Sequence, residues 1–172
     1  QWEPGPEPLS ATPSPALRET RGSAVQEAGR LLCKGRGGLL LGGNALTGPG
    51  LRAAARVAAA TGCGVWIETF PPRQECGRHM PLFPALPYFP EQAIEALANV
   101  ASLVLAGARD PVAFFAYPDQ PSRLLPDGAA LHTLADPDAG VDAALALEAL
   151  VQELDAPAIV TPQRTMPAFQ PS

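Results

Sequence analysis

The residues best suited to chemistry in this sequence are small and polar groups that follow apolar runs. Gly42-Gly43-Asn44 follows the run Leu39-Leu40-Leu41 and precedes Gly48-Pro49-Gly50. A glycine-rich turn after a strand can hold a phosphate on its backbone N–H groups, although this turn is not the G-x-G-x-x-G motif. The alternative is a tight turn that needs glycine for its positive φ. The sequence leaves both interpretations open.

Three further strand ends carry residues of the same kind. Glu68-Thr69 follows the run 64–67, Gly107-Ala108-Arg109 follows 102–106, and Asp136-Pro137-Asp138 follows 130–134. An acidic residue at such a place can hold a ribose hydroxyl, or it can cap the next helix. Ligands of open α/β sheets bind beyond the carboxyl ends of the strands. The candidate cofactor-binding residues are therefore Gly42, Gly43, Asn44, Gly107, Ala108, Arg109, Asp136 and Asp138.

No set of residues in the sequence forms a recognisable active site. Cys76 and His79 have C-x-x-H spacing, but two ligands do not make a metal site, and His132 falls in a predicted strand. The G-x-S-x-G motif of α/β hydrolases does not occur. We therefore predict neither a catalytic residue nor a metal ligand in this chain.

Composition limits the classes of partner and compartment. The 172 residues carry a net charge of −5, and no Lys/Arg stripe is present, which disfavours nucleic acid and anionic membranes as partners. No apolar run reaches the roughly 18–20 residues that span a bilayer. Three cysteines without C-x-x-C spacing do not make a disulfide scaffold, so a cytoplasmic protein is expected.

The elements that would position these residues alternate between helix and strand. Helices are predicted over 23–34, with Ser23 as cap, then over 50–61, from 90 onward and over 139–154. Strands are predicted over 39–41, 64–67, 102–106, 130–134 and 158–160, with a helical turn over 112–117. This alternation indicates βαβ units, and hence an α/β fold with a Rossmann-like open parallel sheet that has helices on both faces.

Proline marks the ends of the chain and one long loop. Five prolines fall within residues 1–15, four within 156–172 and six within 69–90. Proline lacks a backbone donor and favours extended linkers. We predict a Pro-rich interdomain linker over 1–20, an α/β domain over 21–156 and a Pro-rich linker over 157–172. A compact middle between two linkers is typical of an internal domain.

The aromatic residues Phe114, Phe115 and Tyr117 fall close together after the third predicted strand. Such a group of side chains can line a pocket or an interface. Core packing is the more frequent use of an aromatic cluster, and the sequence leaves these interpretations open.

The order and spacing of these segments resemble the central domain of thiamine-diphosphate-dependent enzymes, the group that contains acetolactate synthase and benzoylformate decarboxylase. The resemblance covers roughly residues 20–156, and it implies a fold of the DHS-like NAD/FAD-binding domain type. The segments that carry it are Gly38-Leu39-Leu40-Leu41-Gly42-Gly43-Asn44-Ala45, Gly50-Leu51-Arg52-Ala53-Ala54-Ala55, Glu68-Thr69, Leu86-Pro87-Tyr88-Phe89-Pro90, Leu103-Val104-Leu105-Ala106-Gly107-Ala108-Arg109 and Asp136-Pro137-Asp138.

Enzymes of this family have three domains, and the resemblance covers neither the first, which supplies a catalytic glutamate, nor the third, which binds the cofactor diphosphate through Mg²⁺. It implies an isolated central domain that is structural, with a vestigial nucleotide site, and not catalytic alone. The parent would be a thiamine-diphosphate-dependent transferase or lyase that acts on 2-oxo acids. The implied partners are the N- and C-terminal thiamine-diphosphate-binding domains of the same parent chain, and a homo-oligomer is expected.

The resemblance also bears on FAD and ADP. In this family the central domain binds FAD in acetolactate synthase, ADP in some decarboxylases and neither in many members. FAD-binding members continue after the third strand with Gly-x-Arg-Phe-Asp-Asp-Arg, whereas this chain continues Gly107-Ala108-Arg109-Asp110-Pro111 and keeps only the first arginine. The sequence thus favours a cofactor-free domain. The alternative is a free-standing FAD- or ADP-binding Rossmann-like module, such as an electron-transfer flavoprotein domain.

Overall fold

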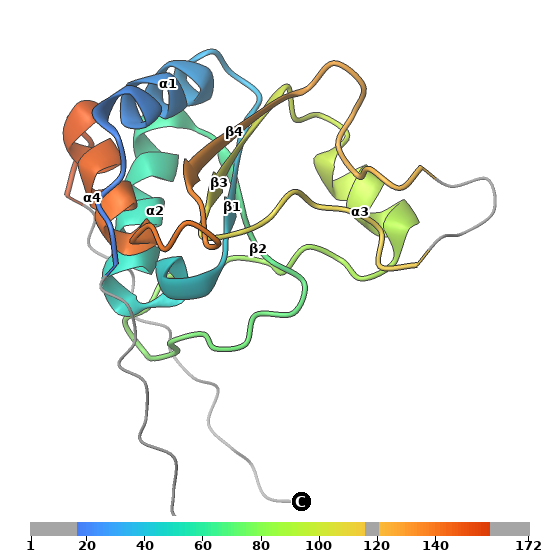
Figure 1. Ribbon diagram of the computed structural model, residues 1–172, viewed down its shortest axis with the longest axis horizontal. Helices are drawn as coiled ribbons and strands as arrows, with labels where there is room; N and C mark the ends of the chain where they lie inside the picture. The colour runs from blue at the N-terminus through green and yellow to red at the C-terminus, as the bar shows by residue number, and fades with distance from the viewer. Residues whose placement is uncertain (1–16, 116–120, 159–172) are drawn as a thin grey trace, which may run out of the picture.

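Two apolar runs that are bounded by small residues form the central strands of the protein. The structure is a computed structural model that describes residues 17–115 and 121–158. Its four strands are β1 (Gly37–Leu41), β2 (Gly64–Ile67), β3 (Ser102–Ala106) and β4 (Ala130–Ala135). They pair in parallel in the order β2-β1-β3-β4 (Figure 1). The predicted open parallel sheet is confirmed.

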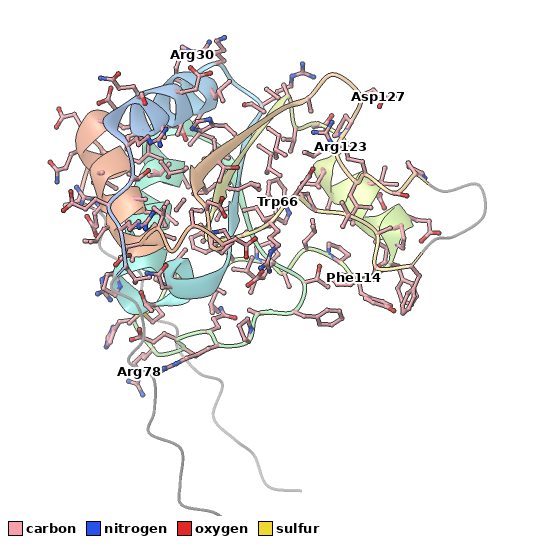
Figure 2. All side chains as sticks on the ribbon, in the orientation of Figure 1. Arg30, Trp66, Arg78, Phe114, Arg123 and Asp127 are labelled. Carbon is pink, nitrogen blue, oxygen red and sulfur yellow. The ribbon has the colours of Figure 1, made fainter. Side chains whose placement is uncertain are left out.

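Helices cover both faces of this sheet, as expected. Three helices, α1 (Gly22–Cys33), α2 (Gly48–Thr61) and α4 (Ala143–Glu153), pack on one face, and α3 (Pro90–Leu97) packs on the other (Figure 1). Side chains along a strand alternate between faces. Leu39 and Leu41 of β1 therefore join the first cluster, while Leu40 joins the second, against which Trp66 also packs (Figure 2).

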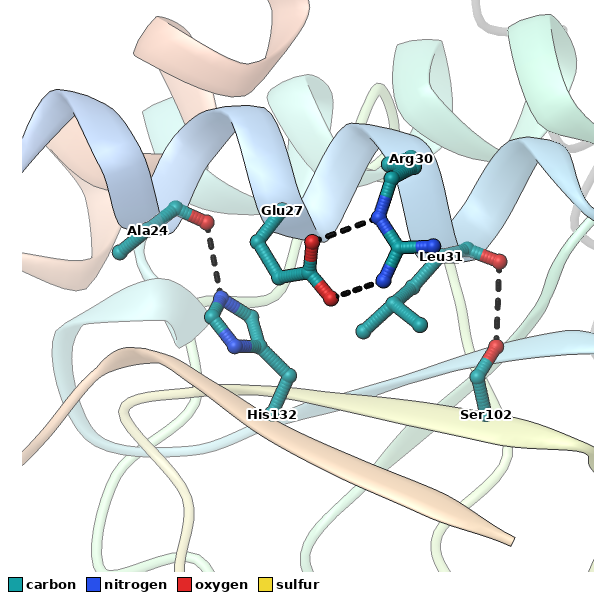
Figure 3. Close-up of polar contacts among 6 residues, drawn as sticks. All are labelled: Ala24, Glu27, Arg30, Leu31, Ser102 and His132. Atoms are coloured by element: carbon teal, nitrogen blue, oxygen red, sulfur yellow. Dashed lines mark hydrogen bonds and ion pairs between the residues drawn. The ribbon is translucent and has the colours of Figure 1, made fainter.

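Two hydrogen bonds tie α1 to the sheet (Figure 3). His132 of β4 donates from Nε2 to the backbone oxygen of Ala24 at 2.8 Å, and Ser102 of β3 donates from Oγ to that of Leu31 at 3.1 Å. Because a carbonyl oxygen only accepts, Nε2 of His132 must carry a proton in this contact. The His132 side chain thus holds α1 against β4, and His132 lies in a strand, as predicted.

Several predicted boundaries are wrong. Ser23 does not cap α1, because the helix begins at Gly22 and Arg21 is its N-cap, without a side-chain bond. Helix α4 begins at Ala143 rather than at 139, because the Asp142 side chain accepts from the N–H groups of the first turn. Both differences are of a few residues, and local caps decide them.

The segment after β3 also differs from the prediction. Val112 forms an antiparallel bridge with Arg123, and no helix occurs over 112–115, the described part of the predicted helical turn. Tyr117 lies outside the described residues, as do 159–160 of the predicted last strand and most of both predicted linkers; Ala158 is not in a strand. Within the described ranges, none of the helices has the length and apolar character needed to cross a membrane.

We expect Leu39→Ala to lower the free energy of unfolding by about 2–5 kcal/mol, because it leaves a cavity in a fully buried strand. Leu145→Ala, at an exposed position of α4, should change it by less than about 0.5 kcal/mol. Urea unfolding followed by circular dichroism measures both values. Equal effects would contradict the placement of β1 at the centre of the core.

Candidate functional site at the carboxyl edge of the sheet

The turns that follow β1 and β3 touch each other through their backbones. Gly42 donates its N–H to the oxygen of Ala106 at 3.0 Å. A Cβ on Gly42 would lie 2.6 Å from the oxygen of Gly107, and a Cβ on Gly107, whose φ is +70°, would lie 2.4 Å from the oxygen of Gly42. The two glycines are therefore required for close packing at this point of the sheet. They support the interpretation of the glycine-rich run as a tight turn.

Asn44 closes the N-terminus of α4. It lies in a short 3₁₀ helix, η1 (Gly43–Leu46), and its Nδ2 donates to Asp142 Oδ1 at 2.7 Å, while its Oδ1 accepts from the N–H of Ala143 at 2.9 Å. Asp142 Oδ1 also accepts from the N–H groups of Ala144 and Leu145, both at 3.0 Å. The first N–H groups of α4, which could bind an anionic ligand, are thus satisfied by this chain's own side chains.

A second carboxylate occupies the N-terminus of α2. The N–H of Gly48 donates to Glu75 Oε2, and the N–H of Glu75 donates to the oxygen of Leu46 at 2.9 Å, which holds the loop after β2 against η1. A hollow of about 430 Å³ adjoins this contact. The helix dipole favours a negative side chain at a helix N-terminus. Here the Glu75 carboxylate occupies the position at which the first N–H groups of α2 would otherwise bind a phosphate.

The predicted residues after β3 and β4 form an exposed ion pair. Arg109 Nε donates to Asp138 Oδ2 at 3.1 Å, and this contact lowers the pKa of Asp138 below its usual value. Asp136 Oδ1 accepts from the N–H of Asp138 at 2.9 Å, so Asp136 stabilises its own turn. The interpretation of Asp136 as the cap of the last helix is therefore wrong, because Asp142 has that role.

A pocket of about 260 Å³ lies where β1, β2 and β3 end. Its floor is apolar, and its polar side chains come from the segments after β2 and β3. The lining residues are Leu40, Glu68, Thr69, Phe70, Leu86, Arg109, Asp110, Pro111, Val112, Phe114 and Leu124. An apolar cavity with a few convergent polar groups is the usual form of a small-molecule site.

Two carboxylates in this pocket have unusual surroundings. Burial raises the pKa of Glu68, while the N–H of Gly43, 3.3 Å from Glu68 Oε1, and the charge of Arg109 act in the opposite direction. Oδ1 of Asp110 is buried and has no hydrogen-bond partner among the described residues, and Oδ2 lies 3.9 Å from Arg123 Nε. The pocket therefore offers acceptors to a ligand.

The eight predicted binding residues share the carboxyl edge of the sheet but do not line one cavity. Arg109 lines the 260 Å³ pocket, and Gly43 and Asn44 line the hollow beside α2. Asp136 lines a separate depression of about 510 Å³ beside β4, while Ala108 is buried. The prediction omitted Glu68, Asp110 and Phe70 from the binding residues, although Glu68 lies at a predicted strand end and carried the necessary signal.

Potential metal ligands are dispersed in the described part of the chain. No group of three His, Cys, Asp or Glu side chains there could hold a metal ion. Cys33, Cys63 and Cys76 are free thiols, and Cys33 and Cys76 are exposed whereas Cys63 is buried. Burial raises the pKa of the Cys63 thiol, which disfavours the reactive thiolate form.

Gly107→Ala should destabilise the protein more than Gly128→Ala. Both positions have a positive φ, but a Cβ on Gly128 meets no atom within 4 Å, whereas one on Gly107 meets the backbone of Gly42. We expect about 1 kcal/mol for the strain that the two variants share, and a larger loss for Gly107→Ala. Thermal unfolding of both variants measures the difference. Equal melting temperatures would contradict the backbone contact.

Glu68→Gln should stabilise the protein increasingly as the pH rises. Burial holds the pKa of Glu68 above the 4.5 of an unfolded chain, so the folded state binds the proton more tightly. The free energy of unfolding of the wild type therefore falls as the pH rises from 4.5 through the raised pKa of Glu68. That of the neutral glutamine variant does not fall for this reason. Urea unfolding at acidic and neutral pH measures the change. Asp127→Asn, in an exposed turn, is the control, and the same pH trend in both variants would contradict the prediction.

Comparison with known proteins gives one close sequence relative. The sequence matches no protein-family model. It is 50% identical over 124 residues to the Mycobacterium tuberculosis protein named "Putative acetolactate synthase large subunit IlvX". That match covers 72% of this chain and 23% of the relative. The chain thus spans about a quarter of the length of its curated relative.

Solved structures of lower sequence identity share the fold. A "putative thiamin diphosphate-dependent enzyme" from Mycobacterium smegmatis matches with a TM-score of 0.62 and 22% identity, over 92% of this chain and 33% of that chain. Benzoylformate decarboxylase from Polynucleobacter necessarius matches with a TM-score of 0.64 and 21% identity, over 99% of this chain and 34% of that chain. The thiamine diphosphate-dependent 4-hydroxybenzoylformate decarboxylase of Rhodococcus jostii RHA1 matches with a TM-score of 0.62 and 21% identity, over 95% of this chain and 32% of that chain. The resemblance found in the sequence is thereby confirmed: the chain is homologous to a segment of a protein named as an acetolactate synthase large subunit, and it has the fold of a domain of thiamine-diphosphate-dependent enzymes.

Proposed function

We propose that this chain is the central, structural domain of a thiamine-diphosphate-dependent enzyme that acts on a 2-oxo acid, and that it is not catalytic alone. The observation that carries the proposal is the 50% identity to a segment of the protein named as an acetolactate synthase large subunit. The matched solved structures support a parent of this class, and this chain covers about a third of each of them. Nothing in the comparisons supports the alternative of an electron-transfer flavoprotein domain.

In this proposal residues 21–156 form the domain, and the Pro-rich segments 1–20 and 157–172 are linkers. The partners are the N- and C-terminal domains of the same parent, which bind thiamine diphosphate and Mg²⁺. The cofactor supplies the chemistry of 2-oxo acid decarboxylation or ligation, and this domain contributes support and spacing. The parent is a cytoplasmic homo-oligomer.

The strand-end residues are proposed as a vestigial nucleotide site. The residues present do not fit the diphosphate of FAD or ADP at the two helix N-termini beside the glycine-rich turn. Glu75 accepts from Gly48 at α2, and Asp142 with Asn44 closes α4. A diphosphate would meet these carboxylates instead of free N–H groups, and like charges repel. We therefore propose that the isolated domain binds neither nucleotide.

Thermal unfolding with and without excess FAD, ADP or thiamine diphosphate with Mg²⁺ tests the proposal. A ligand that binds only the folded state adds about 2.7 kcal/mol at a hundred times its dissociation constant. We expect no shift with any of the three, and no CO₂ release from pyruvate or benzoylformate. A shift with thiamine diphosphate, or turnover, would contradict the assignment as a non-catalytic central domain. A shift with FAD or ADP would instead make the strand-end residues a working site.

A further inference from the structure

The pocket of about 260 Å³ at the ends of β1, β2 and β3 combines a buried apolar floor with exposed aromatic rings. Its floor is formed by Leu40, Leu86 and Leu124, each of which is at most 5% exposed. Phe70 and Phe114 also line it and are 63% and 54% exposed; Phe114 lies on the side of the molecule where α3 lies (Figure 2). Pockets for drug-sized ligands have roughly 300–1,000 Å³, so this one suits a single ring with a short chain.

The two exposed rings of the pocket are held in place by a third. The centroids of Phe70 and Phe114 are 5.1 Å apart, and their planes are tilted by 59°. Tyr88, which does not line the pocket, packs on Phe70 at 5.6 Å and on Phe114 at 5.7 Å. Rings that are already ordered lose little entropy when a ligand packs on them, and the face of an aromatic ring attracts a cation.

Two carboxylates of the pocket are available as hydrogen-bond acceptors. Glu68 is half-buried, makes no ion pair within the described ranges and accepts one long bond, at 3.3 Å, from the N–H of Gly43. Asp110 Oδ1 is buried and has no hydrogen-bond partner in the described part of the chain, and Oδ2 lies 3.9 Å from Arg123 Nε, beyond hydrogen-bond distance. A buried acceptor without a donor costs free energy, and a ligand that donates to it recovers that cost.

The cationic side chain that lines the pocket is already paired. Arg109 donates from Nε and Nη2 to the two carboxylate oxygens of Asp138, at 3.1 and 2.5 Å. An anionic ligand would have to displace Asp138, and it would then lie beside two further carboxylates that repel it. The hydroxyl of Thr69 can either donate or accept. The polar groups of the pocket therefore favour a ligand that donates hydrogen bonds and carries a positive charge.

We propose that this pocket binds a small organic cation, an ammonium group that is attached to an apolar or aromatic body. The body packs on the leucine floor and on the two rings, and the ammonium N–H groups donate to the carboxylates of Glu68 and Asp110. This inference goes beyond the proposed function and does not rest on it. Its test uses neither a nucleotide nor thiamine diphosphate, so its failure and the failure of the family-based proposal are distinguishable.

A two-dimensional NMR titration of the isotope-labelled 172-residue chain with phenethylammonium tests the proposal. We expect saturable shifts of the amide signals of Glu68, Thr69 and Phe70, with a dissociation constant in the millimolar range that is usual for a ligand of about nine heavy atoms. The amide signals of α1, which packs on the opposite face of the sheet, should not move. Phenylacetate has a similar shape and a negative charge, and it should bind at least about tenfold more weakly.

Two carboxylate variants and one control assign the binding to the pocket. Glu68→Gln and Asp110→Asn each remove a charge and keep the size of the side chain, and each should weaken phenethylammonium binding at least about fivefold. Asp127→Asn makes the same change of charge in an exposed turn that does not line the pocket, and it should bind as the wild type does. Far-ultraviolet circular dichroism identifies the variants that fold.

Loss of affinity in either folded carboxylate variant, with none in Asp127→Asn, supports the proposal. Four outcomes would overturn it: no saturable binding to the wild type, equal binding of phenylacetate, shifts confined to another part of the chain, or wild-type affinity in both folded carboxylate variants. An equal loss of affinity in Asp127→Asn would also overturn it, because the attraction would then come from the net charge of the chain and not from this pocket.

Discussion

β1 and β3 can lie at the centre of a parallel sheet only if both of their faces are covered, and the other elements of the domain follow from that requirement. Every position of the two strands is buried, and successive leucines of β1 belong to two different clusters of the core. Three helices meet the requirement on one face. On the other, α3 and the long segments around it do so with fewer side chains, and this face carries the exposed rings.

The sequence was informative where the signal is local. The apolar runs that form β1 and β3 are bounded by small residues. The predicted end of the second helix at residue 61 is confirmed, because Gly62 follows it in the left-handed conformation that glycine favours. The predicted starts of helices were less accurate. Residues 139–142 are compatible with a helix, and only the structure shows that the Asp142 side chain accepts from the first N–H groups of α4. The sequence left open whether Phe114 and Phe115 line a pocket or an interface or pack in the core, because hydrophobic pattern alone does not reveal which apolar residues lack a covering layer; the structure shows both rings exposed.

The edge of the sheet that carries the candidate site could be predicted, but the side chains that line its pocket and their contacts could not, since Arg109 is the one predicted residue in that lining. The rule that ligands bind at strand ends identified the carboxyl edge, and all eight named residues lie there. The partners of those residues come from distant parts of the sequence: Asn44 meets Asp142 across 98 positions, and Glu75 reaches the first turn of α2 across 27. No local pattern contains such pairings. They decide whether a helix N-terminus is open to an anion or closed by the chain itself.

The hydrogen bond between Asn44 and Asp142 also bears on how this domain folds while the ribosome synthesises it. β1, η1 and α2 are synthesised first, yet the first-turn N–H groups that Asn44 and Asp142 satisfy belong to α4, the last helix described. Contacts between such distant segments slow folding, since a long loop must close before they form. The N-terminal half would thus leave the ribosome with its apolar helix faces uncovered.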